Sequence, residues 1–213
     1  MTRIRTGILH IPGLDMAAGA ALRHLLREAL PGAVVLHESY AADQRHWIEE
    51  TLRRWCDEEE LDLVLTVGGT LPAPGPSGRE IVPEATAAVL ERLLPGLPEA
   101  MRAYAQEETP LALIDRGMAG IRGRSAILNL PGGQGAALRF LEAVVEALPA
   151  ILAHLRDDPA APRLADALAD TWDDGEDPAG DSSAAPAQKA ARGLDANEFA
   201  AFLQRRRGER TDG

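Results

Sequence analysis

The sequence predicts an α/β fold, with a mainly parallel sheet covered by helices and a low-complexity C-terminal tail. Strand-like and helix-like segments alternate up to about residue 155, as they do where crossover helices join parallel strands. Beyond about residue 157 Asp, Gly, Ala, Ser and Pro become frequent, and such a composition buries too little apolar surface to order itself. We therefore expect an α/β domain over residues 1–157 and a mostly disordered acidic tail over residues 158–213, with short helices at 162–172 and 195–207.

The first half of the domain contains three expected strands and two expected helices. The strands are at 6–11, 33–36 and 61–67, and the helices are at 16–30 and 43–59. The first helix ends at Pro31-Gly32, a normal helix terminator. Asp43 is placed to act as the N-cap of the second helix. The strand at 33–36 is expected to be short and buried, and the strand at 61–67 is a continuous apolar run, typical of a strand covered on both faces.

The second half continues the alternation after a long loop at 68–78. Helices are expected at 83–93 and 97–107, strands at 111–115 and 125–130 around a turn at 117–123, and a last amphipathic helix from Pro131-Gly132-Gly133 to residue 155. Pro83 suits the first turn of its helix. Pro149 should bend or split the last helix, because proline removes a backbone donor and clashes with the preceding turn.

Charge and cysteine content exclude several classes of function. The formal net charge is -11, from 22 Lys and Arg against 33 Asp and Glu, and this argues against nucleic acid as a partner. An anionic ligand would therefore be held by local backbone N–H groups and a few arginines. The single cysteine, Cys56, excludes an internal disulfide and a cysteine-based zinc site, and we expect it to be an inert, partly buried thiol. No apolar run approaches a membrane span, so we expect a cytoplasmic protein without a membrane partner.

The loop after the strand at 61–67 is the first candidate site. In open α/β sheets, ligands bind beyond the carboxyl ends of the strands. Hydroxyl groups, accessible backbone N–H groups and one arginine suit phosphate oxygens here, and they come from Thr66, Gly68, Gly69, Thr70 and Arg79. Glu80 could hold Mg²⁺ between protein and phosphates. The alternative is a flexible loop with a helix-capping acid. The segment is not a P-loop, because the Lys-Ser/Thr ending is absent.

A second strand also ends in glycines, at Pro131, Gly132 and Gly133, where a helix begins. The amides of a helix N-terminus can hold an anion, although an ordinary strand-to-helix turn is the alternative. The five histidines show no metal-binding spacing. No Ser/His/Asp nucleophile arrangement can be argued from the sequence.

Several motifs in order resemble the MogA/MoaB molybdopterin-binding family. Residues 63–70, followed by residues 79–86, resemble the signature T-T-G-G-T-G…R-D-x-T-P-D/E-A-T. The similarity continues at 114–120, which is close to L-S-R-x-x-x-G, and at 126–132. Upstream, residues 43–48 match the V-P-D-x-x-x-x-I segment. The resemblance spans roughly residues 5 to 155, and the tail lies outside it.

This resemblance implies a three-layer αβα domain that assembles as a homotrimer. It implies molybdopterin as ligand or substrate and ATP as the second substrate, with AMP transferred from ATP to the terminal phosphate of the pterin. The two aspartates credited with catalysis in the family map onto Asp43 and Glu80, which would also be the Mg²⁺ ligands. Other proteins of the cofactor pathway are then expected as partners.

Departures from the family pattern keep an alternative open. Polar or small residues of the signature are replaced at Val67, Leu71, Val82 and Asp115, and the usual Ser or Lys after Gly132 is missing. A pterin-binding or scaffold protein that kept the fold and lost catalysis is therefore the alternative, because sites rather than folds carry function. A pyrophosphate hydrolase of the CinA type ranks lower, since its G-G-x-G-P-T-x-D-D motif is absent.

Overall fold

The structure is a computed structural model that describes residues 3–72 and 81–170. A six-stranded sheet has the order β2-β1-β3-β6-β5-β4. Its strands are β1 (Ile4–His10), β2 (Ala33–Tyr40), β3 (Leu63–Val67), β4 (Arg92–Leu93), β5 (Ala119–Arg122) and β6 (Ser125–Leu130). Strands β2, β1, β3 and β6 are parallel, whereas β5 and β4 continue the sheet antiparallel. The expected mainly parallel sheet is confirmed.

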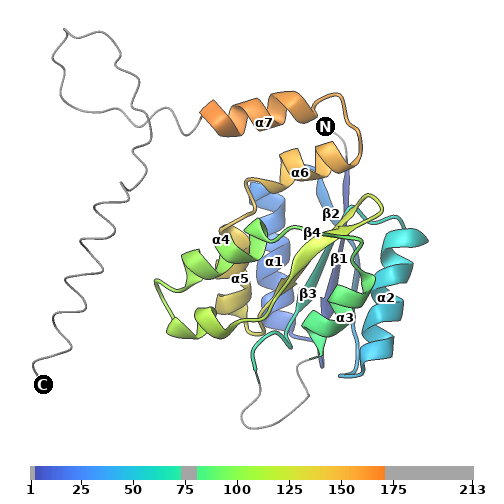
Figure 1. The fold of residues 1–213 in the computed structure, drawn as a ribbon, viewed down its shortest axis with the longest axis vertical. Helices are drawn as coiled ribbons and strands as arrows, with labels where there is room; N and C mark the ends of the chain where they lie inside the picture. The colour runs from blue at the N-terminus through green and yellow to red at the C-terminus, as the bar shows by residue number, and fades with distance from the viewer. Residues whose placement is uncertain (1–2, 73–80, 171–213) are drawn as a thin grey trace, which may run out of the picture. The chain divides into compact units, whose positions relative to one another are not determined.

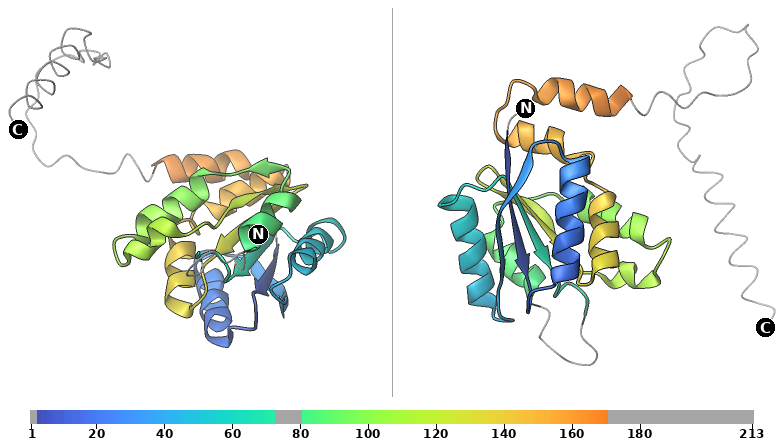
Figure 2. Two further views of the ribbon diagram at one scale, coloured as in Figure 1. Left: turned by 60° about the horizontal axis from the view of Figure 1, so that its bottom comes forward. Right: turned by 180° about the vertical axis from the view of Figure 1, so that it is seen from behind.

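Helices cover both faces of this sheet (Figures 1 and 2). They are α1 (Met16–Ala29), α2 (Arg45–Asp57), α3 (Val82–Val89), α4 (Gly96–Ala105), the 3₁₀ helix η1 (Pro110–Ile114), α5 (Gln134–Glu142), α6 (Leu148–Leu155) and α7 (Ala161–Asp170). One core cluster joins the sheet to α1, α4, α5 and α6, and the other joins it to α2 and α3. Strand β3 serves both, because side chains alternate along a strand: Leu63 and Leu65 enter the first cluster and Val64 the second. The three-layer αβα arrangement is confirmed.

Strand β2 differs from its expected form. It runs to Tyr40 rather than to Leu36, and it lies at the edge of the sheet. Val34 and Leu36 are 36% and 39% exposed, so the expectation of a short buried strand is wrong. The N-cap of α2 is also different. The helix begins at Arg45, and Gln44 is its cap residue, without a side-chain cap bond, so Asp43 does not cap it.

At the antiparallel side of the sheet, strand pairing replaces part of an expected helix and part of an expected turn. The helix expected at 83–93 ends at Val89, because Arg92 and Leu93 pair with β5. Strand β5 in turn lies inside the expected turn at 117–123, and only the segment around Gly123 turns, between β5 and β6. The strand expected at 111–115 is wrong, since these residues form η1 instead.

The last amphipathic segment is split, as expected. Helix α5 ends at Glu142 and α6 begins at Leu148, with Pro149 in the first turn of α6. At this position proline gives up a backbone donor that has no helical partner anyway. No helix in residues 3–72 and 81–170 is long and apolar enough to cross a membrane.

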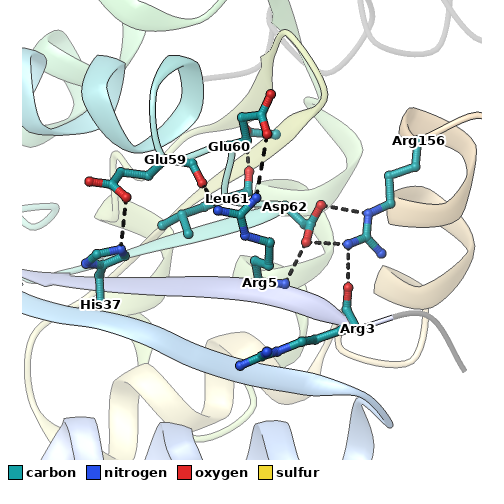
Figure 3. A network of polar contacts seen from close by, with 9 residues as sticks. Arg3, Arg5, His37, Glu59, Glu60, Leu61, Asp62 and Arg156 are labelled. Atoms are coloured by element: carbon teal, nitrogen blue, oxygen red, sulfur yellow. Dashed lines mark hydrogen bonds and ion pairs between the residues drawn. The ribbon is translucent and has the colours of Figure 1, made fainter.

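A polar cluster fixes α6 to the amino ends of the strands (Figure 3). Asp62, only 8% exposed, accepts hydrogen bonds from the backbone N–H of Arg5 and from Nε of Arg156, each at 2.6 Å. Arg156 also donates from Nη2 to the carbonyl oxygen of Arg3 at 2.5 Å. We call Arg5, Asp62 and Arg156 the amino-end clamp. It lies at the end of the sheet opposite the loops that follow β3 and β6.

Cys56 lies buried in α2, and burial raises the pKa of its thiol to about 11. The thiol is therefore protonated at neutral pH, and a protonated thiol is a poor nucleophile. This agrees with the expectation of an inert cysteine.

Removing the segment after Asp158 is expected to change stability little. A groove of about 630 Å³ separates α7 from the body, with Leu164 of α7 on one side and Ile4 and Leu152 on the other. None of residues 161–168 of α7 is buried, so few apolar contacts depend on this helix. We expect a chain that ends at Asp158 to melt within about 4 °C of the full chain. A much larger drop in the melting temperature would show that α7 belongs to the core.

Candidate functional site

The carboxyl ends of three parallel strands lie side by side at one edge of the sheet. His10 of β1 pairs with Val67 of β3, and Val67 pairs with Leu130 of β6. The residues that follow are held together by backbone bonds. The N–H of Ile11 donates to the carbonyl of Val67, and the N–H of Gly68 donates to the carbonyl of Leu130, each at 2.9 Å. The two glycine-ended strands of the sequence are therefore direct neighbours.

The loop after β3 requires glycine at two successive positions. Gly68 and Gly69 have φ values of 101° and 67°, a region that side chains with a Cβ rarely adopt. A Cβ atom on Gly68 would overlap the carbonyl oxygen of Ile11, and one on Gly69 would lie 2.5 Å from Cγ2 of Val82. We call Gly68, Gly69 and Thr70 the glycine loop. Gly68 is buried and Gly69 is partly exposed, so Gly69 is the part of this loop whose backbone a ligand can approach.

The turn after β6 lies against this loop. A Cβ on Gly132 would be 3.5 Å from the Cα of Gly68, an ordinary contact distance. Pro131 is buried, whereas Gly132 and Gly133 are exposed, and Gly133 is the N-cap of α5 with φ 89°. The first amides of α5 have no partner within the helix and carry the positive end of its dipole. The two segments predicted to bind phosphate are thus adjacent in the structure.

A buried polar network behind the glycine loop was missed by the sequence interpretation. The Nδ2 of Asn129 donates to the hydroxyls of Thr66 at 2.8 Å and Thr86 at 2.9 Å, and its Oδ1 accepts the N–H of Met118 at 3.1 Å. Asn129 and both threonines are fully buried. The signal was the polar Asn129 between two leucines of a buried strand. Buried polar groups need partners, so this residue had to bond to neighbouring elements.

The hydroxyl of Thr70 is also engaged within the protein. Thr70 is fully buried, and its hydroxyl donates to Oδ2 of Asp115. Oδ1 of the same carboxylate accepts the N–H of Gly117 at 2.8 Å, and the N–H of Arg116 donates to the carbonyl of Thr70 at 3.0 Å. Burial raises the pKa of Asp115, although the hydrogen bonds from Thr70 and Gly117 and the charge of Arg102 act in the opposite direction.

Asp43 lies in the loop between β2 and α2, at the same edge of the sheet as the glycine loop. Its side chain is exposed and makes no hydrogen bond or ion pair within residues 3–72 and 81–170. Both carboxylate oxygens are thus available to a hard cation such as Mg²⁺, which prefers one or two carboxylates together with phosphate oxygens and water. Arg79 and Glu80, the other two predicted polar residues, lie outside the described residues.

No group of three or more His, Cys, Asp and Glu side chains in the described part of the chain could hold a metal ion by itself. A cation at Asp43 would therefore depend on ligands from the substrate or from elsewhere in the chain. This is the usual situation for Mg²⁺ in phosphate chemistry, where the protein provides few ligands and phosphate oxygens complete the shell.

Comparison with known proteins gives consistent results. Residues 11–167 match the family described as probable molybdopterin binding domain. The molybdopterin adenylyltransferase of Helicobacter pylori strain J99 is 42% identical over 132 residues, which are 62% of this chain and 73% of that protein. The molybdopterin adenylyltransferase of Escherichia coli K12 is 37% identical over 134 residues, 63% of this chain and 67% of the relative.

A solved structure shows the same arrangement of elements. The molybdopterin biosynthesis enzyme MoaB from Thermus thermophilus superposes with a TM-score of 0.64 at 40% sequence identity, over 73% of this chain and 98% of that chain. The identity is high enough that fold and sequence point to the same group of proteins.

Proposed function

The chain belongs to the family of probable molybdopterin-binding domains, and from this premise we propose that it transfers AMP from ATP to molybdopterin during molybdenum-cofactor biosynthesis. Relatives at 37–42% identity that are molybdopterin adenylyltransferases support an enzyme of this kind. ATP, Mg²⁺ and the roles of individual residues are part of the proposal.

One observation carries the proposal furthest: the glycine loop and the N-terminus of α5 meet at the carboxyl edge of the sheet. A Cβ on Gly132 would lie 3.5 Å from the Cα of Gly68, so the N–H of Gly69 and the first N–H groups of α5 can face one anionic group. Such a surface attracts phosphate locally, even though the net charge of the chain is -11. A substrate with a terminal phosphate, and a second one with a triphosphate, fit this chemistry.

The reaction needs alignment and charge neutralisation rather than covalent help from the protein. An oxygen of the terminal phosphate of molybdopterin attacks the α-phosphorus of ATP, the bond to the β-phosphate oxygen breaks, and pyrophosphate leaves. The amide of Gly69 and the guanidinium of Arg79 would hold the phosphates in line, whereas the N–H of Gly68 is bonded to the carbonyl of Leu130. Asp43 and Glu80 would hold Mg²⁺, which when bound neutralises charge on the phosphate oxygens.

The direct test is to incubate the purified protein with molybdopterin, ATP and Mg²⁺ and to detect adenylylated molybdopterin by mass spectrometry. An ATP analogue with a methylene group between the α- and β-phosphorus should give no product, because the bond that must break is replaced. Molybdopterin binding without product, under conditions where the Escherichia coli relative is active, would favour the pterin-binding scaffold suggested by the missing Ser or Lys after Gly132.

We also propose that the protein is a cytoplasmic homotrimer that binds other proteins of the cofactor pathway. Leu111, Leu113 and Ile114 of η1 are 58%, 64% and 51% exposed, an unusual concentration of apolar surface in one turn. Such patches are commonly hidden between subunits, and a closed three-fold ring hides them without leaving a free edge.

Light scattering at micromolar concentration is expected to give the mass of three chains. Leu113→Glu should shift that mass towards one chain, because a buried charge without a partner opposes association. A wild-type mass of one or two chains would contradict the trimer. An unchanged mass for Leu113→Glu would place the interface elsewhere.

A further inference from the structure

We propose that Asp115 is a positioning residue that fixes the glycine loop in the conformation needed for phosphate binding. The inference rests on the proposed function, but the contacts that carry it belong to the protein alone. Asp115 follows η1, and Thr70 ends the glycine loop, 45 positions earlier in the chain. The carboxylate joins these two segments behind the surface that a phosphate would contact.

Three bonds form this connection. The Thr70 hydroxyl donates to Oδ2 of Asp115, the N–H of Gly117 donates to Oδ1, and the N–H of Arg116 donates to the carbonyl of Thr70. We call Thr70, Asp115 and these two amides the loop latch. On its other side, Nη1 of Arg102 donates to the carbonyl of Gly117 at 3.3 Å. The loop is thereby anchored to α4 as well as to the segment before β5.

The latch explains why two flexible glycines keep one conformation. Gly68 and Gly69 have φ values that only glycine adopts readily, and glycine also allows many other conformations. Something outside the loop must select this one. Backbone bonds fix the loop at Gly68, and the latch fixes it at Thr70, so Gly69 is held from both sides. Preorganised N–H groups bind charge without reorganisation at the moment of reaction.

Burial makes the latch costly to break. Asp115 is 6% exposed and Thr70 is fully buried, so loss of one partner leaves a polar group without solvent. An alanine at position 115 would leave the Thr70 hydroxyl and the Gly117 N–H without their acceptor. An asparagine there can keep both contacts, because its Oδ1 accepts from Gly117 and its Nδ2 donates to the oxygen of Thr70.

The amino-end clamp supplies a matched control. Asp62 is also a buried aspartate, and it accepts one backbone N–H, from Arg5, and two side-chain N–H groups, from Nε and Nη2 of Arg156. Asp62 directly precedes β3, whose other end leads into the glycine loop. Asp62→Ala should therefore destabilise the fold as Asp115→Ala does, without touching the glycine loop.

The first experiment compares kcat and KM for ATP in Asp115→Ala, Asp115→Asn and Asp62→Ala, in the full chain with Mg²⁺. We expect Asp115→Ala to lower kcat/KM by about 10²-fold, since a misplacement of about 1 Å costs that much. Asp115→Asn should stay within about threefold of wild type, because it keeps the hydrogen-bond geometry. Asp62→Ala should leave kcat and KM unchanged below its melting temperature. Equal losses in Asp115→Ala and Asp62→Ala would reduce the effect to stability and overturn the proposal.

A double-mutant cycle tests whether Thr70 acts through Asp115. Thr70→Val keeps the shape of the side chain and removes the hydroxyl, so it should lower kcat/KM in the same way as Asp115→Ala. The double variant Thr70→Val/Asp115→Ala should be no worse than the poorer single variant, because residues in one network are not additive. Fully additive losses would show that Thr70 and Asp115 act independently, and would overturn the latch.

Amide hydrogen exchange separates this inference from the proposed function. The N–H groups of Gly117 and Arg116 donate within the latch, so Asp115→Ala should speed their exchange by about tenfold or more, whereas Asp62→Ala should not. This readout needs no activity. If the wild-type protein forms no adenylylated product and the exchange rates change as expected, the proposed function fails and the latch stands. Unchanged exchange in Asp115→Ala overturns the latch whatever the activity.

Discussion

Gly68→Ala is expected to lower kcat/KM for adenylyl transfer by about 10²-fold and to destabilise the protein. The backbone at Gly68 has φ 101°, and an added Cβ would overlap the carbonyl oxygen of Ile11. Strain of this kind costs on the order of 1–3 kcal/mol of unfolding free energy. The overlap with the backbone adds to that cost unless the loop moves. If the loop moves, the bond from the Gly68 N–H to the carbonyl of Leu130 is disturbed, and a displacement of about 1 Å lowers kcat/KM by about 10²-fold.

The control for this variant is Gly96→Ala, at the first residue of α4. Within the described residues nothing lies within 4 Å of a Cβ at this position, and φ is outside the left-handed region. Alanine is the better helix former by up to about 1 kcal/mol, so stability should rise rather than fall. Denaturant titration and steady-state kinetics measure both effects. Wild-type activity in Gly68→Ala would mean that the glycine loop does not bind substrate.

Asp43→Asn and Glu80→Gln are each expected to lower kcat by about 10²–10³-fold, the usual loss when one group that stabilises transition-state charge is removed. Both changes keep the size of the side chain and remove its charge, so the cation would lose a ligand. Folding should be unaffected by Asp43→Asn, because the Asp43 side chain is exposed and forms no bond within the described part of the chain. Surface changes of this kind alter stability by at most about 0.5 kcal/mol.

Glu50→Gln is the matched control, since Glu50 is an exposed carboxylate on α2, the helix that follows Asp43. Its activity should equal that of the wild type, which separates a local role of Asp43 from a general effect of charge. Titration with Mg²⁺ adds a second readout, because a weakened cation site should need more Mg²⁺ for half-maximal rate. Activity within a factor of two of wild type would remove the altered residue from the mechanism.

The glycine-rich ends of β3 and β6 could be identified from the sequence because their signal is local. A buried apolar run followed by glycines predicts a strand that ends in an accessible loop, and parallel strands place such ends at one edge. The motifs around Gly68 and Pro131 resembled one family, and this gave the three-layer fold. Arg79, Glu80 and the cation remain predictions, since the first two lie outside the described residues.

Other features depended on partners far away in the chain. Residues 111–115 carry apolar side chains that suit a strand, yet residues 110–114 form η1, and Arg92 and Leu93 pair with β5 at the edge of the sheet instead. Asp43 suited a helix cap by its residue type, but α2 begins two residues later and leaves its carboxylate exposed.

The sequence by itself determined the alternation of strands and helices, the parallel core of the sheet and the two glycine-ended strands, because periodicity and glycine placement are properties of short segments. Only the tertiary structure decided that Asn129 bonds to Thr66 and Thr86, and that Asp115 holds Thr70. These partners lie 63, 43 and 45 positions apart. From the residue type alone one can predict that a buried polar group needs a hydrogen-bond partner. Which residue becomes that partner depends on how β3, α3 and β6 pack against one another.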